Sequence, residues 1–556
     1  MKPAYFLHKS APYDHQVDAV CKLYPLTFGA EFMEQGTGKT KVAIDLATNW
    51  YKEGLIDAVM VIAPNGVHDQ WKDEELPKHH SEEVPRVALA WSASLGRSHS
   101  KSGIKELHDH IYKPVNGLKW FMINVDAFST DTHVPMFREY VRRNKTLVIV
   151  DEATRIKNPD AKRSTNIKYG LCDLTKAGKR ILKAAPLSTK RLVLTGTMVT
   201  NSPYDLWNMF EFLSPGFWGI DFFTFKLRYG IERRMEVPGR RGTYYRKITS
   251  KEMDQVRKYA RLGKECDEIA RMFALSESSV RFIIDNPHIR APYKNLDELK
   301  RKIEPYAFIV RKQDCLDLPP KIYEKLYVEM NDEQKRVYSS MLREMSAEYN
   351  DMELTALNKV SLILRLQQIT GGFFPSGMDE EEPTVQIGKK NPKIEALKAD
   401  LDECSDFPII IAARFRAEIE AITTELTAHY EGEKTVRCIY GSTSMDERRE
   451  IRDAFLRNEV DVLVASARII GTGFNLQNSH MMYRYSNSYS FEDYAQLEDR
   501  IHRNGQTSDT VVYKDLIVRK TVDEQVYEVL QNKKDLLEFM RDKTLHEFIG
   551  RMKGDE

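Results

Sequence analysis

Hydrophobic residues gather along this chain into short continuous runs that end at polar or turn residues. The clearest runs are residues 58–63, 120–125, 146–150, 408–413 and 461–466. A run of this length without alternation is typical of a strand covered on both faces, as in a parallel sheet flanked by helices. Other segments, such as residues 17–23 and 41–47, have helical apolar spacing. The pattern predicts the α/β fold class with parallel sheets.

The length and composition of the chain change this picture in two ways. At 556 residues the chain exceeds one ordinary core, so we expect two large domains and a smaller element. The 83 basic and 82 acidic residues give a formal net charge of +1, so any contact with nucleic acid must come from local clusters of charge. The six cysteines form no C-x-x-C pair, which argues against zinc and disulfides and favours a reducing cytoplasm.

Residues 33–40, Met-Glu-Gln-Gly-Thr-Gly-Lys-Thr, indicate a phosphate-binding loop. They lie between a predicted strand and a predicted helix, the context that this motif requires. Gly36 and Gly38 let the backbone curl, so that N–H groups including that of Thr37 point at phosphate oxygens beside the positive end of the helix. The loop therefore predicts a site for the phosphates of ATP.

The last two residues of this loop carry its chemistry. Lys39 would reach the β and γ phosphates, and the Thr40 hydroxyl would hold Mg²⁺. Upstream, Gln16 begins a predicted helix, and a glutamine at this distance from a phosphate loop is suited to read both edges of adenine.

Two acidic residues, Asp151 and Glu152, follow the run at 146–150. Carboxylates at the end of a strand are often helix caps, but open α/β sheets also place ligand-binding groups there. Together with Lys39 they favour hydrolysis: Asp151 would hold Mg²⁺ through water, and Glu152 would orient or deprotonate the attacking water.

Residues 151–158, Asp-Glu-Ala-Thr-Arg-Ile-Lys-Asn, resemble the DEAH-R-I-K-N box of Swi/Snf-type ATPases of helicase superfamily two, with Thr154 in place of histidine. Residues 194–197 with 206–215 resemble the third motif of that family, and residues 317–321 resemble the stretch leading out of its first lobe. The resemblance covers nearly the whole chain. It implies two RecA-like lobes that hold ATP between them.

Three segments near the C-terminus extend the resemblance. Gly441 and Ser442 lie in a turn that faces the nucleic-acid groove in this family, and residues 471–476 match the fifth motif, in which Gly473 would bind the nucleotide and Asn475 would meet DNA phosphates. Residues 496–506 match the sixth motif. Its Arg500 and Arg503 are three residues apart, so on one helical face both would approach the γ-phosphate.

An insertion between residues 221 and 300 departs from the family. Its first part, residues 233–247, reads as a hairpin in which basic residues, Arg240 and Arg241 among them, alternate with tyrosines. Such a face suits contact with a phosphate backbone, although charged edges also protect surface hairpins from aggregation. Both interpretations remain open.

The second part of the insertion, residues 259–284, resembles a helix-turn-helix. The apolar positions that would lock its two helices are Ile269, Ala270, Phe273, Leu275, Val280 and Ile283. Its second helix would present Ser278, Ser279 and Arg281 to a major groove. The same spacing occurs in packing units of three helices, so its DNA role stays open.

These observations predict the following division of the chain: residues 1–220, first RecA-like lobe; 221–300, insertion with hairpin and helix-turn-helix; 301–375, end of the first lobe and a helical protrusion over 332–370; 376–391, linker; 392–520, second RecA-like lobe; 521–556, C-terminal helical brace.

The resemblance implies a DNA-dependent ATPase that moves along double-stranded DNA or remodels what is bound there, using ATP and Mg²⁺. An unwinding or branch-migration helicase, and a helix-turn-helix regulator switched by ATP, are the alternatives. We expect a monomer, no membrane association and a DNA-bound protein as a further partner. The expected location is the cytoplasm of a prokaryotic or virus-infected cell, or the nucleus of a eukaryote.

Overall fold

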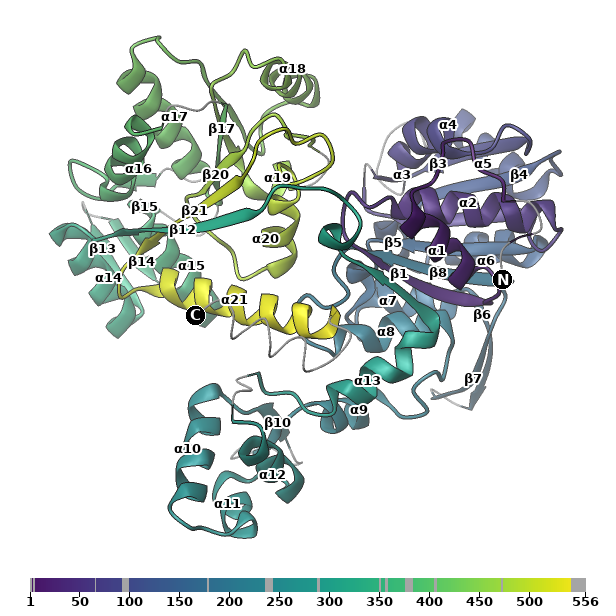
Figure 1. Ribbon diagram of the computed structural model, residues 1–556, viewed down its shortest axis with the longest axis horizontal. Coiled ribbons are helices and arrows are strands. Elements are labelled where there is room, and N and C mark those ends of the chain that lie inside the picture. The colour runs from purple at the N-terminus through teal and green to yellow at the C-terminus, as the bar shows by residue number, and fades with distance from the viewer. Residues whose placement is uncertain are drawn as a thin grey trace. The chain divides into compact units, whose positions relative to one another are not determined.

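The computed structural model describes residues 3, 6–65, 67–92, 100–177, 180–235, 244–287, 291–349, 352–355, 359–375, 384–404, 408–471 and 474–541. It divides into two compact α/β units (Figure 1). Unit 1 comprises Met1–Cys315 with Asp535–Glu556, and unit 2 comprises Leu316–Lys534. Each unit contains a parallel, RecA-like sheet, so the predicted fold class is confirmed.

The sheet of unit 1 has seven strands in the order β11-β1-β8-β5-β2-β4-β3, and all their pairings are parallel. The strands are β1 (Phe28–Met33), β2 (Ala58–Ala63), β3 (Arg86–Trp91), β4 (Leu118–Asn124), β5 (Thr146–Asp151), β8 (Lys190–Thr195) and β11 (Ala307–Val310).

Helices cover this sheet because its apolar runs have two faces to bury. Every residue of β2 and of β5 is buried, as the unbroken runs predict. The helices of unit 1 include α1 (Asp14–Leu23), α2 (Lys39–Lys52), α3 (Val67–Gln70), α4 (Leu76–His79), α5 (Lys101–Tyr112), α6 (Val134–Arg143), α7 (Lys162–Gly170), α8 (Asp205–Leu213), α9 (Phe222–Tyr229) and α13 (Leu296–Ile303). A π-helical turn, Trp71–Glu75, separates α3 from α4.

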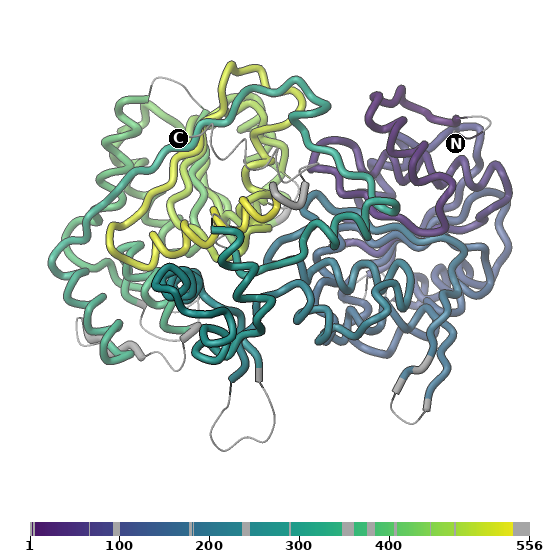
Figure 2. Tube along the Cα trace, turned by 60° about the horizontal axis from the view of Figure 1, so that its bottom comes forward, coloured from purple at the N-terminus to yellow at the C-terminus, as the bar shows by residue number. Residues whose placement is uncertain are grey.

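Two further parts belong to unit 1. A hairpin of β6 (Cys172–Ala177) and β7 (Arg180–Pro186) stands away from the seven-stranded sheet (Figures 1 and 2). The insertion contains a second hairpin, β9 (Glu232–Met235) with β10 (Tyr244–Lys247), and three helices. These helices are α10 (Ser250–Arg261), α11 (Cys266–Phe273) and α12 (Glu277–Asp285).

The sheet of unit 2 has six parallel strands in the order β12-β21-β20-β17-β19-β18. Its strands are β12 (Lys321–Val328), β17 (Ile409–Ala413), β18 (Val436–Ile439), β19 (Val462–Ser466), β20 (Met481–Arg484) and β21 (Val511–Val518). Successive residues of β17 enter two different apolar clusters, Ile409 and Ile411 in one, Ile410 and Ala412 in the other. Both faces of this sheet are therefore covered.

The helices of unit 2 are α14 (Asp332–Glu344), α15 (Lys359–Thr370), α16 (Pro392–Asp402), α17 (Arg416–Tyr430), α18 (Met445–Leu456), α19 (Ala467–Ile470), α20 (Phe491–Glu498) and α21 (Val522–Arg541), the last of which continues past the end of the unit.

The division between the units differs from the predicted one in three places. Strand β12 lies in the second sheet beside β21, so the change of unit falls at Leu316 and not at the predicted linker, residues 376–391. Within that linker, β16 (Thr384–Gln386) pairs with β15 (Phe373–Pro375). The predicted helical stretch 332–370 is interrupted by a hairpin of β13 (Ser346–Tyr349) and β14 (Met352–Thr355). A strand that pairs far away in sequence cannot be assigned to a lobe from local pattern alone.

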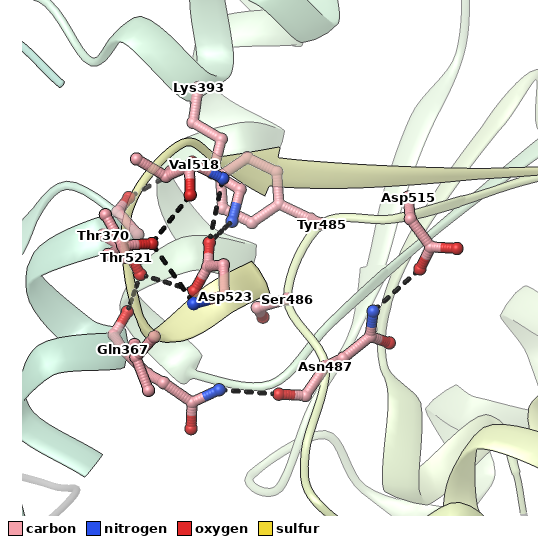
Figure 3. Close-up of polar contacts among 12 residues, drawn as sticks. Gln367, Thr370, Lys393, Tyr485, Ser486, Asn487, Asp515, Val518, Thr521 and Asp523 are labelled. Atoms are coloured by element: carbon pink, nitrogen blue, oxygen red, sulfur yellow. Dashed lines mark hydrogen bonds and ion pairs between the residues drawn. The ribbon is translucent and has the colours of Figure 1, made fainter. Parts of the chain in front are cut away.

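A buried polar network ties the elements of unit 2 together (Figure 3). Asp523, at the start of α21, forms an ion pair with Lys393 at 3.0 Å and accepts a hydrogen bond from the Thr370 hydroxyl at 2.9 Å. Gln367 of α15 donates to the carbonyl of Asn487, whose amide donates to Asp515 of β21. The first turn of the C-terminal helix is thus anchored to α15 and α16.

Among the helices that the described residues form, none is both long enough and apolar enough to cross a membrane.

Candidate active site

The phosphate loop connects β1 to α2, as predicted. Gly36 and Gly38 have φ angles of 86° and 92°, which residues with a Cβ rarely adopt. Gly38 also has no space for a side chain, since a Cβ there would lie 2.2 Å from Nε2 of Gln16. Thr37 is buried, and its hydroxyl donates to the carbonyl of Glu34 at 2.7 Å. The loop is therefore closed by its own contacts.

Gln16 supports this loop from α1. Its Nε2 donates to the carbonyl of Thr37 at 3.0 Å, and its Oε1 accepts from the N–H of Tyr13 at 3.1 Å. A ring nitrogen of His15 approaches the same Thr37 carbonyl at 2.8 Å. In this structure both ends of the Gln16 amide engage protein groups and position the loop, so its adenine contact stays a prediction.

Lys39 and Thr40 are the first residues of α2 and are partly exposed. A Cβ placed on Gly196, in the predicted third motif, would lie 3.6 Å from Nζ of Lys39. The ammonium group thus lies at the carboxyl end of the sheet, beside β8. This is the edge at which open α/β sheets bind ligands.

Asp151 ends β5 at the same edge and is 7% exposed. Its Oδ2 accepts a hydrogen bond from the indole Nε1 of Trp71 at 2.8 Å, and its Oδ1 accepts from the N–H of Glu152 at 2.9 Å. Burial raises the pKa of Asp151, while the Trp71 hydrogen bond and the charge of Lys39 act in the opposite direction.

Glu152 has a left-handed backbone, with φ 50° and ψ 58°. For a residue other than glycine this is a strained conformation of the kind that clusters at functional sites. Its Oε1 accepts a hydrogen bond from Nε2 of Gln35, in the phosphate loop, at 3.2 Å. The structure therefore brings the loop and the two strand-end carboxylates together, as the sequence predicts.

Residues 151–158, here called the acidic box, are connected to the third motif by side-chain hydrogen bonds that the sequence does not predict. Nζ of Lys157 donates to the Thr200 hydroxyl at 2.7 Å, and that hydroxyl donates to Asp205 at 2.9 Å. Thr154, which replaces the family's histidine, is buried. Asn208 also donates to the Ile156 carbonyl, so both Lys157 and Asn208 connect the two motifs.

The oxygen groups at this edge fit Mg²⁺, which prefers carboxylate, hydroxyl and water ligands. The Thr40 hydroxyl and the Asp151 carboxylate are the predicted ones. Glu31 of β1 adds a further carboxyl that is 0% exposed, and neither of its oxygens has a hydrogen-bond partner among the described residues. Sequence reasoning missed Glu31 and Trp71; the signal for Glu31 was an acidic residue inside an apolar strand.

In unit 2 the two predicted arginines differ. Helix α20 ends at Glu498, so Arg500 and Arg503 do not share the face of a regular helix, which corrects the prediction. Arg500 is 8% exposed, and its guanidinium donates to the carbonyls of Gln496 and Phe474. It therefore joins the sixth motif to the fifth.

Arg503 is partly exposed, and its guanidinium donates to Oδ1 of Asn475, a residue predicted to contact DNA. Gly473 lies outside the described residues. Gly441 and Ser442 are exposed in the turn before α18, where Arg448 donates to the Gly441 carbonyl at 2.9 Å. The exposed turn is compatible with the predicted groove contact.

Helices α11 and α12, packed with α10, occupy the segment predicted as a helix-turn-helix. All six predicted apolar positions are buried in one cluster. Ala274 forms the turn with φ 51°, and Ser276 caps α12 by accepting from the N–H of Ser279. The two helices and the apolar positions that the sequence predicts are therefore in place, and the helix-turn-helix assignment stays a prediction.

Only some of the residues predicted to contact DNA are exposed to solvent. Ser278 and Arg281 are exposed on α12. Ser279 is 2% exposed and accepts a hydrogen bond from Nζ of Lys294 at 2.9 Å, so its predicted groove contact is wrong: the side chain faces the interior. Arg240 and Arg241 lie outside the described residues.

Two basic residues of the hairpin β9–β10 bind a carboxylate within the insertion. Arg233 and Arg246 both donate to the Glu252 carboxylate, at 2.9 and 2.8 Å, and Glu252 also closes the capping box of α10. These hydrogen bonds hold the pKa of Glu252 well below its usual range. The carboxylate therefore ties the hairpin to the three helices.

Comparisons with known proteins give a consistent result. Residues 32–371 match the model of the SNF2-related domain, and residues 392–505 match that of the helicase conserved C-terminal domain. The TATA-binding protein-associated factor MOT1 of Saccharomyces cerevisiae is 23% identical over 427 residues, covering 68% of this chain and 19% of that protein. The DNA excision repair protein ERCC-6-like of Mus musculus is 23% identical over 548 residues, covering 93% of this chain and 40% of that protein.

The chain thus spans well under half the length of these curated relatives. Among solved structures, the Sulfolobus solfataricus SWI2/SNF2 ATPase core in complex with dsDNA is similar over 97% of this chain and 95% of that chain, with 21% identity and a TM-score of 0.37.

Proposed function

Because the chain belongs to the SNF2-related family, the Snf2-type ATPases of helicase superfamily two, we propose that it is an ATP-driven motor that moves along double-stranded DNA. The observation that carries this proposal is the convergence of Lys39, Asp151 and Glu152 at one edge of the first sheet, within a chain that matches both family models.

In the proposed reaction, Lys39 binds the β and γ phosphates, and the N–H groups at the start of α2 hold them in place. Mg²⁺, held by Thr40 and through water by Asp151, would neutralise negative charge on the phosphates. Glu152 orients the attacking water and accepts its proton. Its Gln35 contact and left-handed backbone fix the carboxylate before the nucleotide arrives.

For Arg503 we propose the role that the resemblance to the family's sixth motif implies, which is to supply positive charge to the transition state. Its guanidinium donates to the neutral amide oxygen of Asn475, a contact that a phosphate oxygen would replace. Arg500 acts on the fold, because its hydrogen bonds hold the Phe474 carbonyl beside the sixth motif. Asn475 then connects Arg503 to a segment proposed to meet DNA.

A second candidate is a regulator in which ATP only switches the affinity of the helix-turn-helix for DNA. The exposure of Ser278 and Arg281 on α12 favours this reading of the insertion. It differs from the motor in one measurable way: a static switch gains nothing from longer DNA.

The test is the ATPase rate on blunt linear duplexes of increasing length at constant total base pairs. A motor that moves along duplex turns over more ATP per binding event as length increases. A rate that is independent of length would favour the switch. Single strands, forks and four-way junctions, compared in the same assay with a strand-separation readout, distinguish a translocase from an unwinding or branch-migration helicase.

A further inference from the structure

Glu31 is a fully buried acid that neither the fold nor the proposed reaction uses. It is 0% exposed, and its Oε1 and Oε2 have no hydrogen-bond partner among the described residues. Burial raises the pKa of this carboxyl well above its ordinary value; the charge of Lys39 opposes this rise, and that of Asp151 adds to it. Lys39 and Asp151 are therefore its charged neighbours.

The register of the sheet relates Glu31 to Asp151 independently of these charges. Glu31 of β1 pairs with Leu194 of β8, and Leu194 pairs on its other side with Asp151 of β5. Residues paired in a parallel sheet point to the same face, so Glu31 and Asp151 flank Leu194 on one face. Leu194 belongs to the apolar cluster that also contains Val42 and Leu46 of α2, so this is the face that α2 covers.

A carboxyl in this place destabilises the fold. Burying a polar group without a hydrogen bond is unfavourable, and such groups in native structures call for an explanation. Each of the strand neighbours paired with Glu31, Leu194 and Phe308, is apolar, so a leucine at position 31 would suit the sheet better than an acid. The acid is explained if it gains a partner when ligand binds.

We propose that Glu31 is a positioning residue for the divalent cation of the ATP site: its carboxyl hydrogen-bonds a water carried by the cation that Thr40 and Asp151 hold. This inference rests on the proposed function, because it assigns a role to Glu31 only if nucleotide binds at the loop. Outer partners of this kind fix the water shell of a metal and tune its affinity.

The test is calorimetric ADP binding to the full chain, in EDTA and across a series of Mg²⁺ concentrations, for the parent, E31L and E31Q. We expect E31L to lose about tenfold or more of the Mg²⁺-dependent gain in ADP affinity, the loss typical of an outer metal partner, while its affinity in EDTA stays unchanged. Without nucleotide, E31L should melt at a higher temperature than the parent, because the unpaired carboxyl is gone.

Each other outcome contradicts the inference. An undiminished Mg²⁺-dependent gain in E31L overturns it while leaving the proposed function intact, whereas a parent that binds no ADP overturns both. An equal loss in EDTA and in Mg²⁺ would assign Glu31 to the shape of the loop alone. If E31L does not fold, the test uses E31Q, which keeps the shape of the side chain. We expect E31Q to lose part of the Mg²⁺-dependent gain in ADP affinity. An unchanged gain in E31Q overturns the inference.

Glu418 offers a matched control in unit 2. It is 1% exposed, and its Oε1 likewise has no partner among the described residues. E418Q should change the melting temperature without changing the Mg²⁺-dependent gain. A gain that fell equally in E418Q and E31Q would show a general effect of removing a buried acid, and would overturn the assignment of Glu31.

Discussion

The indole Nε1 of Trp71 donates a 2.8 Å hydrogen bond to Oδ2 of Asp151, across 80 residues of sequence. The donor begins the π-helical turn Trp71–Glu75, and such turns are frequent at functional sites. Burial raises the pKa of Asp151, and this bond opposes that rise, so it favours the charged carboxylate where Mg²⁺ is proposed to bind.

Replacing Trp71 with phenylalanine tests this relationship. W71F keeps an aromatic ring but removes the donor, so we expect Mg²⁺ to be needed at about tenfold higher concentration for half-maximal ATPase activity. The measurement is a Mg²⁺ titration at saturating ATP. W120F is the control, because Trp120 is also buried and lies 6.2 Å from Trp71, ring to ring, but its indole N–H has no hydrogen-bond partner among the described residues. Equal Mg²⁺ requirements in both variants would contradict the role of Trp71.

Much of this site could be predicted from sequence because its parts are local. The glycines of the loop, Lys39, and Asp151 at a strand end follow from short motifs and from the apolar run before each. The roles of Trp71 and Glu31 could not be predicted in this way, since they depend on which strands are neighbours in the sheet. The order β1-β8-β5-β2 is a long-range property of the chain.

Three predictions from the sequence, for the two arginines, Ser279 and strand β12, are wrong for related reasons. Arg500 and Arg503 match a family motif, but the end of α20 at Glu498 decides their environments, and helix ends are poorly determined by pattern. Ser279 is a polar residue at a helix start, and only the packing of Lys294 against it shows that it faces inward. Strand β12 was assigned to the wrong unit because its partner, β21, lies nearly 190 residues away.

Two substitutions at the loop and the acidic box separate binding from hydrolysis. K39A removes the charge at the β and γ phosphates, so ATP turnover should be abolished, whereas E152Q should bind nucleotide but not turn it over. Turnover and fluorescent-nucleotide binding measure the two steps. Normal ATPase activity in either variant would contradict the site assignment.

Alanine substitutions at the two arginines of the sixth motif should affect different properties, ATP turnover in one case and stability in the other. R503A should reduce turnover by on the order of 10³-fold at saturating DNA, with ground-state ATP affinity and melting temperature nearly unchanged. R500A should lower stability by about 1–3 kcal/mol, because buried carbonyls lose a charged donor. Urea denaturation and single-turnover ATP hydrolysis compare them. A loss confined to DNA affinity in R503A would move that residue to the DNA-binding surface.

The insertion should lose stability in acid through Glu252. Its pKa is depressed in the folded protein, so it contributes stability above the ordinary glutamate pKa of about 4.3, and this contribution is lost as pH falls toward the folded value. The protection of the α10 amides against hydrogen exchange, relative to the intrinsic rate at each pH, should therefore fall in the parent below about pH 4.3. E252Q should exchange faster at neutral pH and depend less on pH. E277Q, at an exposed position on α12, should behave as the parent; equal profiles for all three would contradict the role of Glu252.

The last prediction concerns whether α12 binds DNA. Arg281 is exposed and has no ion pair among the described residues, so it is free to contact a phosphate or a base edge. R281A should weaken duplex affinity and reduce the slope of log affinity against log salt by about one, since one fewer phosphate contact releases one fewer counterion. DNA-independent ATPase activity should stay unchanged. K258A removes a charge that is also exposed, on α10 of the same insertion, and should leave both affinity and slope as in the parent. If R281A and K258A behave alike, α12 does not bind DNA through Arg281, and its exposed face is left for packing or for a protein partner.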